Sequence, residues 1–195
     1  FFSVGLFIIL PNLLAGLMPF DKSTWLGGVY YNLFEGVVRV GLFIGYLALV
    51  SRIKDMKRIW QYHGAEHKTI HCYEAEEELT IENVMRFSTK HPRCGTSFLF
   101  IVMIVSIIIF SLLPLSSMIL VNAMLRLALV PFVAGISYEI IKFAGRSEWK
   151  IMKVISAPGM LFQYFTTREP EEDQVEVAIT AFNNVLIQES NEDKW

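Results

Sequence analysis

The chain has 195 residues, of which 53% are hydrophobic and only 18% are charged. Soluble domains usually carry about a quarter charged residues, so this composition and the mean hydropathy of +0.44 exclude a disordered chain and disfavour an ordinary cytosolic globule. The net charge of −2 argues against nucleic-acid binding, which normally needs a basic surplus. Two cysteines are too few for a disulfide scaffold. The composition predicts a membrane protein.

Two apolar stretches open the chain. Residues 1–18 are almost wholly apolar, and the first residue already lies inside this run, so we expect a further segment upstream. A second stretch covers about 29–50, is rich in glycine and contains Glu35 and Arg39. About 20 apolar residues cross the ~30 Å hydrocarbon layer of a bilayer. Residues 1–50 are therefore predicted to form the first two membrane spans.

A polar segment at 51–97 separates these stretches from two more apolar ones. Residues 98–120 are rich in Ile, Val and Phe, and the sequence at 113–117 predicts a break near the end of this span. A fourth apolar run follows at 121–143. Residues 98–144 are therefore predicted to form a transmembrane helical hairpin.

The last segment, 145–195, is predicted to lie outside the hydrocarbon layer. Its apolar stretch at 154–165 is too short to cross a bilayer and contains Pro158 and Gly159, so we expect an interrupted, interfacial piece. From Glu171 onward, apolar residues recur at helical spacing behind a group of acidic residues. This pattern predicts a C-terminal amphipathic helix.

Basic residues mark one side of the predicted membrane. They cluster after the second span, before the third and after the fourth, whereas Lys22 stands alone in the opposite loops. The positive-inside rule then places the 51–97 segment and the C-terminus in the cytoplasm. The predicted fold is all-α, a polytopic helical membrane protein with about four transmembrane helices, and the lipid bilayer is its first expected partner.

All histidines and cysteines of the chain gather in one part of the polar segment. They are His63, His67, His71, Cys72, His91 and Cys94. Histidine stripes seldom arise without a role in proton or metal chemistry. The alternative is that these side chains merely solvate a helix at the membrane surface.

Residues 63–67 read His-Gly-Ala-Glu-His, which matches the H-x-x-E-H pattern of inverted zinc peptidases. Positions i and i+4 share one face of a helix, so His63 and His67 can reach a single ion. Glu66 lies near the same edge and is the predicted general base for a metal-bound water. His71 continues the stripe at i+8.

A catalytic zinc ion usually takes three protein ligands and keeps one position for water. The third ligand is predicted to be Glu139, at the cytoplasmic end of the fourth span, or His91. Histidine and carboxylate ligands also suit other divalent metals, such as iron, manganese or nickel. A structural zinc site of His71, Cys72, His91 and Cys94 is an alternative, as is a buried, inert thiol for either cysteine.

Two charged residues lie inside the second predicted span. Charges within a span are costly and usually face a bundle interior, a partner or a cavity. Glu35 and Arg39 stand at i and i+4, so they can satisfy each other or line a path for a substrate or ion. Arg126 in the fourth span has the same two interpretations and is also close enough to the outer surface to reach it.

Several stretches, in order along the chain, match one family pattern. They read YHGAEHKT at 62–69, HPRCGTS at 91–97, YE at 138–139, PG at 158–159, TTREP at 166–170 and EVA at 176–178. Together with Gln163, these stretches resemble the bacterial DUF1385 (YqhQ-like) family of membrane proteins over essentially the whole chain.

The resemblance implies a metal-dependent enzyme of the bacterial cytoplasmic membrane. It also implies one functional cluster, whose members are His63, Glu66, His67, His91, Arg93, Cys94, Glu139, Gln163, Thr166, Thr167 and Glu169. In the family pattern a glycine-rich segment with an Ala-Val-x-Glu-Gly-Val-Met-Met-Arg motif comes first, and we expect it upstream of this chain. His71 is not carried over by the resemblance.

The leading hypothesis is a zinc-dependent hydrolase at the cytoplasmic face, acting on a membrane-associated substrate that is lipid-linked or a peptide. Arg93 would stabilise a developing oxyanion or hold an acidic group of the substrate. The alternative is an ion or solute transporter or channel in which Glu35, Arg39 and Arg126 line the path and the histidines gate it or sense metal. A scaffold with a structural zinc ion is a third hypothesis. No nucleic-acid partner is expected, and a homo-oligomer is compatible with the sequence.

Overall fold

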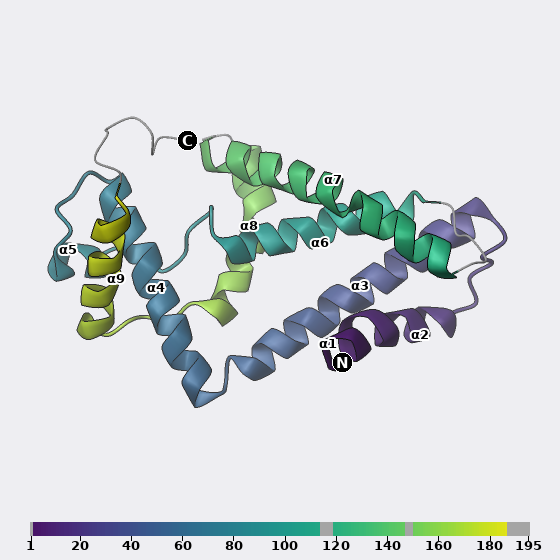
Figure 1. Ribbon diagram of the computed structural model, residues 1–195, viewed down its shortest axis with the longest axis horizontal. Coiled ribbons are helices and arrows are strands. Elements are labelled where there is room, and N and C mark those ends of the chain that lie inside the picture. The colour runs from purple at the N-terminus through teal and green to yellow at the C-terminus, as the bar shows by residue number, and fades with distance from the viewer. Residues whose placement is uncertain (1, 114–118, 147–149, 187–195) are drawn as a thin grey trace. The chain divides into compact units, whose positions relative to one another are not determined.

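The computed structural model describes residues 2–113, 119–146 and 150–186, and in this part of the chain the ordered elements are helices, without strands (Figure 1). The all-α prediction is therefore confirmed for the described residues. In chain order the helices are α1 (Phe2–Val4), the π-helix η1 (Gly5–Ile9), α2 (Leu10–Gly16), α3 (Trp25–Val50), α4 (Lys54–Glu74), α5 (Ile81–Met85), α6 (Gly95–Ser111), α7 (Ile119–Arg146), α8 (Lys150–Thr166) and α9 (Glu172–Val185).

The helices divide into two compact units, each made of two separate stretches of chain. Unit 1 comprises Phe1–Tyr46 and Phe98–Ile141, and unit 2 comprises Leu47–Ser97 and Lys142–Trp195. Unit 1 contains most of the apolar helices. Unit 2 contains every histidine and both cysteines, so the chemistry predicted from the sequence belongs to it.

Two helices are long and apolar enough to cross a bilayer, judged by length and composition over the described residues. They are Trp25–Val50 and Met124–Ala144, and only 11% and 17% of their most apolar windows are buried within the protein. A core helix of a soluble protein would be mostly buried, so this exposure favours contact with lipid.

The four predicted spans are not all reproduced. The first and third correspond to shorter apolar helices, Gly5–Gly16 and Gly95–Ser111. Since an α-helix rises 1.5 Å per residue, the 17 residues of α6 reach about 25 Å, less than the ~30 Å hydrocarbon thickness. Apart from Leu113, the predicted break at 113–117 lies outside the described residues.

The predicted interruption of the 154–165 stretch is wrong. One helix, α8, continues through Pro158 to Thr166. Proline removes one backbone hydrogen bond from a helix interior, but α8 keeps its helical backbone at Pro158. The next residue, Gly159, allows close packing. A Cβ on Gly159 would lie 2.9 Å from the Ser97 Cβ, so the small residue lets α8 pack directly against the start of α6.

The core of unit 2 lies between α4, α5 and α9, which lie side by side (Figure 1). Its fully buried residues are Ala65, Cys72, Val84 and Val175. The amphipathic C-terminal helix is confirmed as α9, which begins with a capping box formed by Glu171 and Gln174. This box satisfies backbone N–H groups that the first helical turn leaves free. Val175 of α9 packs with Ala65 and Cys72 of α4 in this core.

Candidate metal centre

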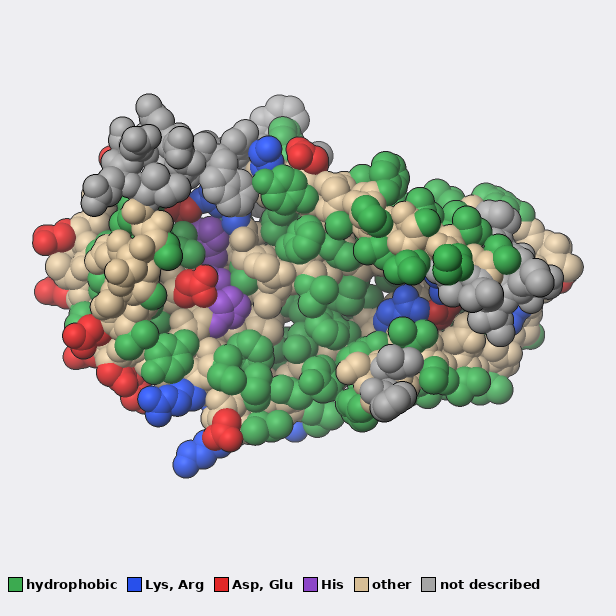
Figure 2. All heavy atoms as spheres, in the orientation of Figure 1, with side chains coloured by type: hydrophobic (Ala, Val, Ile, Leu, Met, Phe, Trp, Pro, Cys, Tyr) green, Lys and Arg blue, Asp and Glu red, His purple; other side chains and the backbone are tan. Residues whose placement is uncertain are grey.

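Helix α4 presents two histidines to the same side of unit 2. His63 and His67 stand one turn apart, their ring centroids are 4.4 Å from each other, and His67 is only 3% exposed. The i, i+4 spacing read from the sequence therefore produces the expected pair. Histidine side chains reach the molecular surface of this unit beside an acidic side chain (Figure 2); of the pair, His63 is partly exposed and His67 is buried.

Backbone carbonyls orient both rings. The Nδ1 of His63 lies 2.7 Å from the Thr166 carbonyl oxygen at the end of α8. The Nδ1 of His67 lies 2.6 Å from the Thr89 carbonyl oxygen in the loop before α6. A carbonyl accepts, so each Nδ1 is the donor in these bonds and each Nε2 is left for another partner. Metal-binding histidines are held by outer hydrogen bonds of this kind.

Cys94 completes a three-residue group. Its Sγ lies 3.2 Å from the Nε2 of His63, and the ligand atoms of His63, His67 and Cys94 all lie within 4.8 Å of one another. Cys94 immediately precedes α6, where the Thr96 N–H and hydroxyl also lie close to the sulfur. A helix N-terminus favours the thiolate form.

The electrostatics of this group also favour a thiolate. Burial raises the pKa of Cys94, but hydrogen bonds from His63, His67 and Thr96 outweigh it and lower the pKa to about 5. Burial lowers the pKa of His63, but its bonds to Cys94 and the Thr166 carbonyl prevail, so the net shift is upward. Without metal, the two shifts favour a thiolate at Cys94 and a protonated imidazole at His63.

A second group adjoins the first and is a hydrogen-bonded network. The Nε2 of His91 lies 3.2 Å from the Glu74 carboxylate, while its Nδ1 accepts from the Arg93 N–H at 3.2 Å. Both nitrogens are therefore engaged in hydrogen bonds in this arrangement, although the ligand atoms of His71, Glu74 and His91 also lie within 4.8 Å of one another. Burial lowers the pKa of His91 to about 4 despite the nearby Glu74. His71 Nε2 donates to the Lys90 carbonyl oxygen, at 2.8 Å.

Gln163 holds the loop that carries His91 and Cys94. It is fully buried on α8, and its side-chain oxygen accepts from the His91 N–H at 2.8 Å. Its Nε2 donates to the His91 carbonyl at 2.7 Å and to the Ser97 hydroxyl at 2.8 Å. The Thr167 hydroxyl donates in turn to the Gln163 carbonyl. Gln163 and Thr167 therefore support the site and are not themselves ligands.

Replacing Gln163 with leucine should destabilise unit 2. Leucine has a similar volume but leaves the His91 N–H and carbonyl unpaired, at a cost of about 1–3 kcal/mol for each buried polar group. Chemical denaturation of the detergent-solubilised protein measures this change. Leu161→Met on the exposed side of α8, where Leu161 is 60% exposed, is the control and should change stability by less than about 0.5 kcal/mol. Equal stabilities would show that the Gln163 bonds do not support the loop.

The segment after α8 lies directly against α4. The Arg168 N–H donates to the Trp60 carbonyl at 2.9 Å, and a Cβ on Gly64 would overlap the Arg168 carbonyl oxygen. Nearby, the buried Lys68 Nζ pairs with the Glu169 carboxylate at 2.9 Å and donates to carbonyls at the end of α5. The glycine within the histidine motif is thus required for close approach.

The remaining predicted site residues lie in several places. Glu66 is exposed, and its charge helps to raise the pKa of His63. Arg93 forms an ion pair with Glu74. Glu139 is exposed on α7 in unit 1. The structural zinc alternative is not assembled, because Cys72 is buried in the apolar core of unit 2, where burial raises its pKa.

Glu35 and Arg39 belong to unit 1 and form an ion pair with each other. This is the first of the two interpretations that their i, i+4 spacing allowed. Arg126 joins the same pair. The structure thus gathers the three intramembrane charges predicted from the sequence into one network, described below.

Sequence reasoning missed the two backbone carbonyls, at Thr89 and Thr166, that orient the histidine rings. The family resemblance had indicated Thr166, but its carbonyl acts on His63, while its hydroxyl lies 3.4 Å from the Phe162 carbonyl within α8. No side-chain type could have identified Thr89, because the interaction uses only its backbone. Lys68, buried beside His67, was also missed.

Two comparisons with known proteins agree on one family. The family model described as "Protein of unknown function (DUF1385)" matches residues 1–188. The curated "Uncharacterized protein YqhQ" of Bacillus subtilis (strain 168) is 37% identical over 186 residues, which are 95% of this chain and 57% of that protein. The chain thus spans less than two thirds of the relative. No solved structure matches the chain significantly.

Proposed function

The chain belongs to the DUF1385 family, and we propose that it is a zinc-dependent hydrolase whose metal ligands are His63, His67 and Cys94. One observation carries this proposal. Both imidazoles are anchored through Nδ1 to carbonyl oxygens, and one ligand atom of each lies within 4.8 Å of a thiol that is disposed to ionise. Two histidines and a cysteinate suit zinc, and they leave a fourth position for water.

The residues around this group fit a hydrolytic mechanism. A bound zinc ion would act as a Lewis acid and acidify its water ligand. Glu66, exposed and one turn from His63, would accept the proton of the attacking water and pass it to the leaving group. Arg93, held against Glu74, would hold an anionic group of the substrate. Because Glu66 is one residue from His67, the base and both histidine ligands lie on the same helix, α4.

The site would work at a membrane. We place the four apolar helical stretches in the bilayer, with unit 2 and its histidines on the cytoplasmic side, as the positive-inside rule requires. The exposed apolar windows of α3 and α7 support this arrangement. The substrate would then be membrane-associated, with its scissile bond near the headgroup level.

Metal analysis and a hydrolysis screen on the same purified protein test the proposal. Inductively coupled plasma mass spectrometry should find about one zinc per chain in the wild type and in Glu66→Gln, and none in His67→Ala. In proteoliposomes, a mass-spectrometric screen of lipid-linked esters, phosphodiesters and membrane peptides should yield a product with the wild type alone. Wild-type protein that takes up no zinc after reconstitution with the metal would refute the metal centre. Product formation by Glu66→Gln at the wild-type rate would refute the role of Glu66.

The pH dependence of zinc affinity reports on the protonation of His63 and Cys94. Because the pKa of Cys94 is about 5 and that of His63 is raised, zinc should displace the His63 proton at pH 6 but none from Cys94. Affinity should rise by about tenfold per pH unit below the pKa of His63 and then level off. Competition with a chromophoric chelator between pH 5 and 9 measures it. A further tenfold rise between pH 8 and 9 would indicate an ordinary thiol and contradict the pair.

A further inference from the structure

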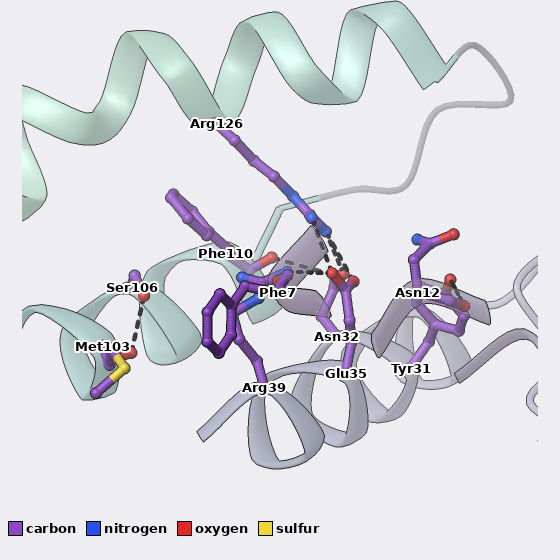
Figure 3. A network of polar contacts seen from close by, with 10 residues as sticks. All are labelled: Phe7, Asn12, Tyr31, Asn32, Glu35, Arg39, Met103, Ser106, Phe110 and Arg126. Carbon is purple, nitrogen blue, oxygen red and sulfur yellow. Dashed lines mark hydrogen bonds and ion pairs between the residues drawn. The ribbon is translucent and has the colours of Figure 1, made fainter. Parts of the chain in front are cut away.

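Three charged side chains of unit 1 meet within one polar network (Figure 3). Glu35, only 3% exposed, forms ion pairs with Arg39 one turn along α3 and with Arg126 of α7. Arg126 also donates to the Asn32 side-chain oxygen at 2.9 Å. Arg39 donates through Nε to the Phe7 carbonyl of the π-helix η1, at 3.0 Å. The network thus joins α3, α7 and the N-terminal helices of the unit.

The charges in this network do not cancel. Two guanidinium groups share the single carboxylate of Glu35, which leaves one positive charge uncompensated. The other acidic residues of unit 1 are Asp21 and Glu139. The Asp21 carboxylate is exposed and bonded to Ser23. Glu139 follows Arg126 by 13 positions on the same helix, which is about 20 Å at 1.5 Å per residue.

An uncompensated charge among apolar helices is costly and is normally met by a counter-ion. Both arginine side chains remain partly accessible, with Arg39 27% and Arg126 26% exposed. Arg39 donates through Nε and one Nη, and its other Nη has no partner among the residues that the structure describes. Glu35 is therefore shared between both arginines, which together keep one positive charge, and Arg39 keeps an unused donor among the described residues.

We propose that Arg39 and Arg126 form a binding site for a phosphate oxyanion, supplied by the headgroup of an anionic lipid. Guanidinium groups offer paired N–H donors that match phosphate oxygens. Glu35 and Asn32 hold the Arg126 guanidinium in place, and Glu35 and the Phe7 carbonyl do the same for Arg39. The ligand would bring the network to neutrality. This site belongs to unit 1 and is independent of the metal ligands.

Binding of three ligands of different charge and chemistry by the wild-type protein tests this proposal. Delipidated full-length protein in a neutral detergent is titrated with phosphatidylglycerol, with phosphatidylcholine and with inorganic phosphate, and binding is followed by native mass spectrometry and thermal unfolding. Wild-type protein should bind phosphatidylglycerol about tenfold more tightly than phosphatidylcholine. Tighter binding of inorganic phosphate than of phosphatidylglycerol would keep the oxyanion site but overturn the lipid as its source. Binding of none of the three would overturn the site.

Substitutions that change the network charge should act in opposite directions. Arg126→Gln leaves the Glu35–Arg39 pair intact and the network neutral, so phosphatidylglycerol affinity should fall about tenfold. Glu35→Gln leaves two positive charges, so affinity should rise. The double variant restores a single positive charge and should return affinity toward the wild-type value. Lys22→Gln, a basic residue of unit 1 outside the network, is the control and should change nothing.

The charge series separates an anion site from a structural network. If the charges only hold the helices together, Glu35→Gln would lower the melting temperature without increasing lipid affinity. Where Glu35→Gln does not fold, Arg126→Gln and Lys22→Gln decide the outcome, because the Glu35–Arg39 ion pair persists in both. Unchanged phosphatidylglycerol binding by folded Arg126→Gln would overturn the proposal.

Discussion

Replacing Cys94 with alanine is expected to lower zinc affinity by at least about a hundredfold, whereas Cys72→Ala should leave it unchanged. Loss of an outer-shell partner already weakens metal sites by about 10–100-fold, and loss of a ligand should exceed this. Cys94 lies 3.2 Å from the Nε2 of His63. Cys72 is buried in the apolar core of unit 2. Two thiols in the same unit thus have opposite expected roles.

The two variants should differ in a second measurement. Cobalt substitution of the wild type should give a thiolate-to-cobalt charge-transfer band in the near ultraviolet, which Cys94→Ala removes and Cys72→Ala retains. Cys72→Ala should instead lower the free energy of unfolding by about 1 kcal/mol, because it leaves a small cavity beside Val84 and Val175. A charge-transfer band that survives in Cys94→Ala would exclude Cys94 as a ligand and point to another sulfur donor.

Gly64→Ala is expected to destabilise unit 2 and to weaken zinc binding at the same time. The new Cβ would overlap the Arg168 carbonyl oxygen, and the Arg168 backbone is tied to α4 through the Trp60 carbonyl. Overpacking of this kind costs about 1–3 kcal/mol. Displacing residues 166–168 would also pull the Thr166 carbonyl away from His63 Nδ1, and loss of such a partner costs about 10–100-fold in metal affinity.

Gly41→Ala is the matched control for this helix glycine. It lies within α3, and a Cβ at that position would meet no atom within 4 Å. Alanine is favoured over glycine in a helix interior by about 1 kcal/mol, so this variant should be as stable as the wild type or more stable. Denaturant unfolding and zinc titration of both variants provide the comparison. Gly64→Ala with wild-type stability would show that α4 and the segment after α8 do not pack closely in solution.

The histidine pair could be predicted because its geometry is local. The spacing of His63 and His67 within one helix fixes their common face, and neither long-range packing nor a partner is needed to infer it. The amphipathic helix after Glu171 could be predicted for the same reason. Acidic residues precede a regular apolar stripe there, and helix capping depends only on neighbours three residues apart.

The rest of the site depends on contacts that sequence spacing does not encode. Cys94 lies beside His63 because Gln163 holds the loop that carries both His91 and Cys94. Gln163 is 72 residues from His91 in the sequence. Pro158 predicted an interruption from local chemistry alone, but α8 continues and packs Gly159 against Ser97. Local rules predicted helix type and face in this chain, whereas tertiary packing decided which residues complete the cluster.

The Thr166 carbonyl that orients His63 also sets the time at which the complete site can form during synthesis. His63 and the Thr166 carbonyl are separated by 103 residues, and the whole stretch of unit 1 from Phe98 to Ile141 lies between them. At the usual translation rate of about 5–20 residues per second, α4 leaves the ribosome roughly 5–20 s before its partner. During this interval, His63 would meet cellular metal ions without the Thr166 carbonyl that fixes its tautomer. For the zinc site proposed above, high-affinity binding would then start only once α8 has folded back, which would delay metal capture until the chain is nearly complete.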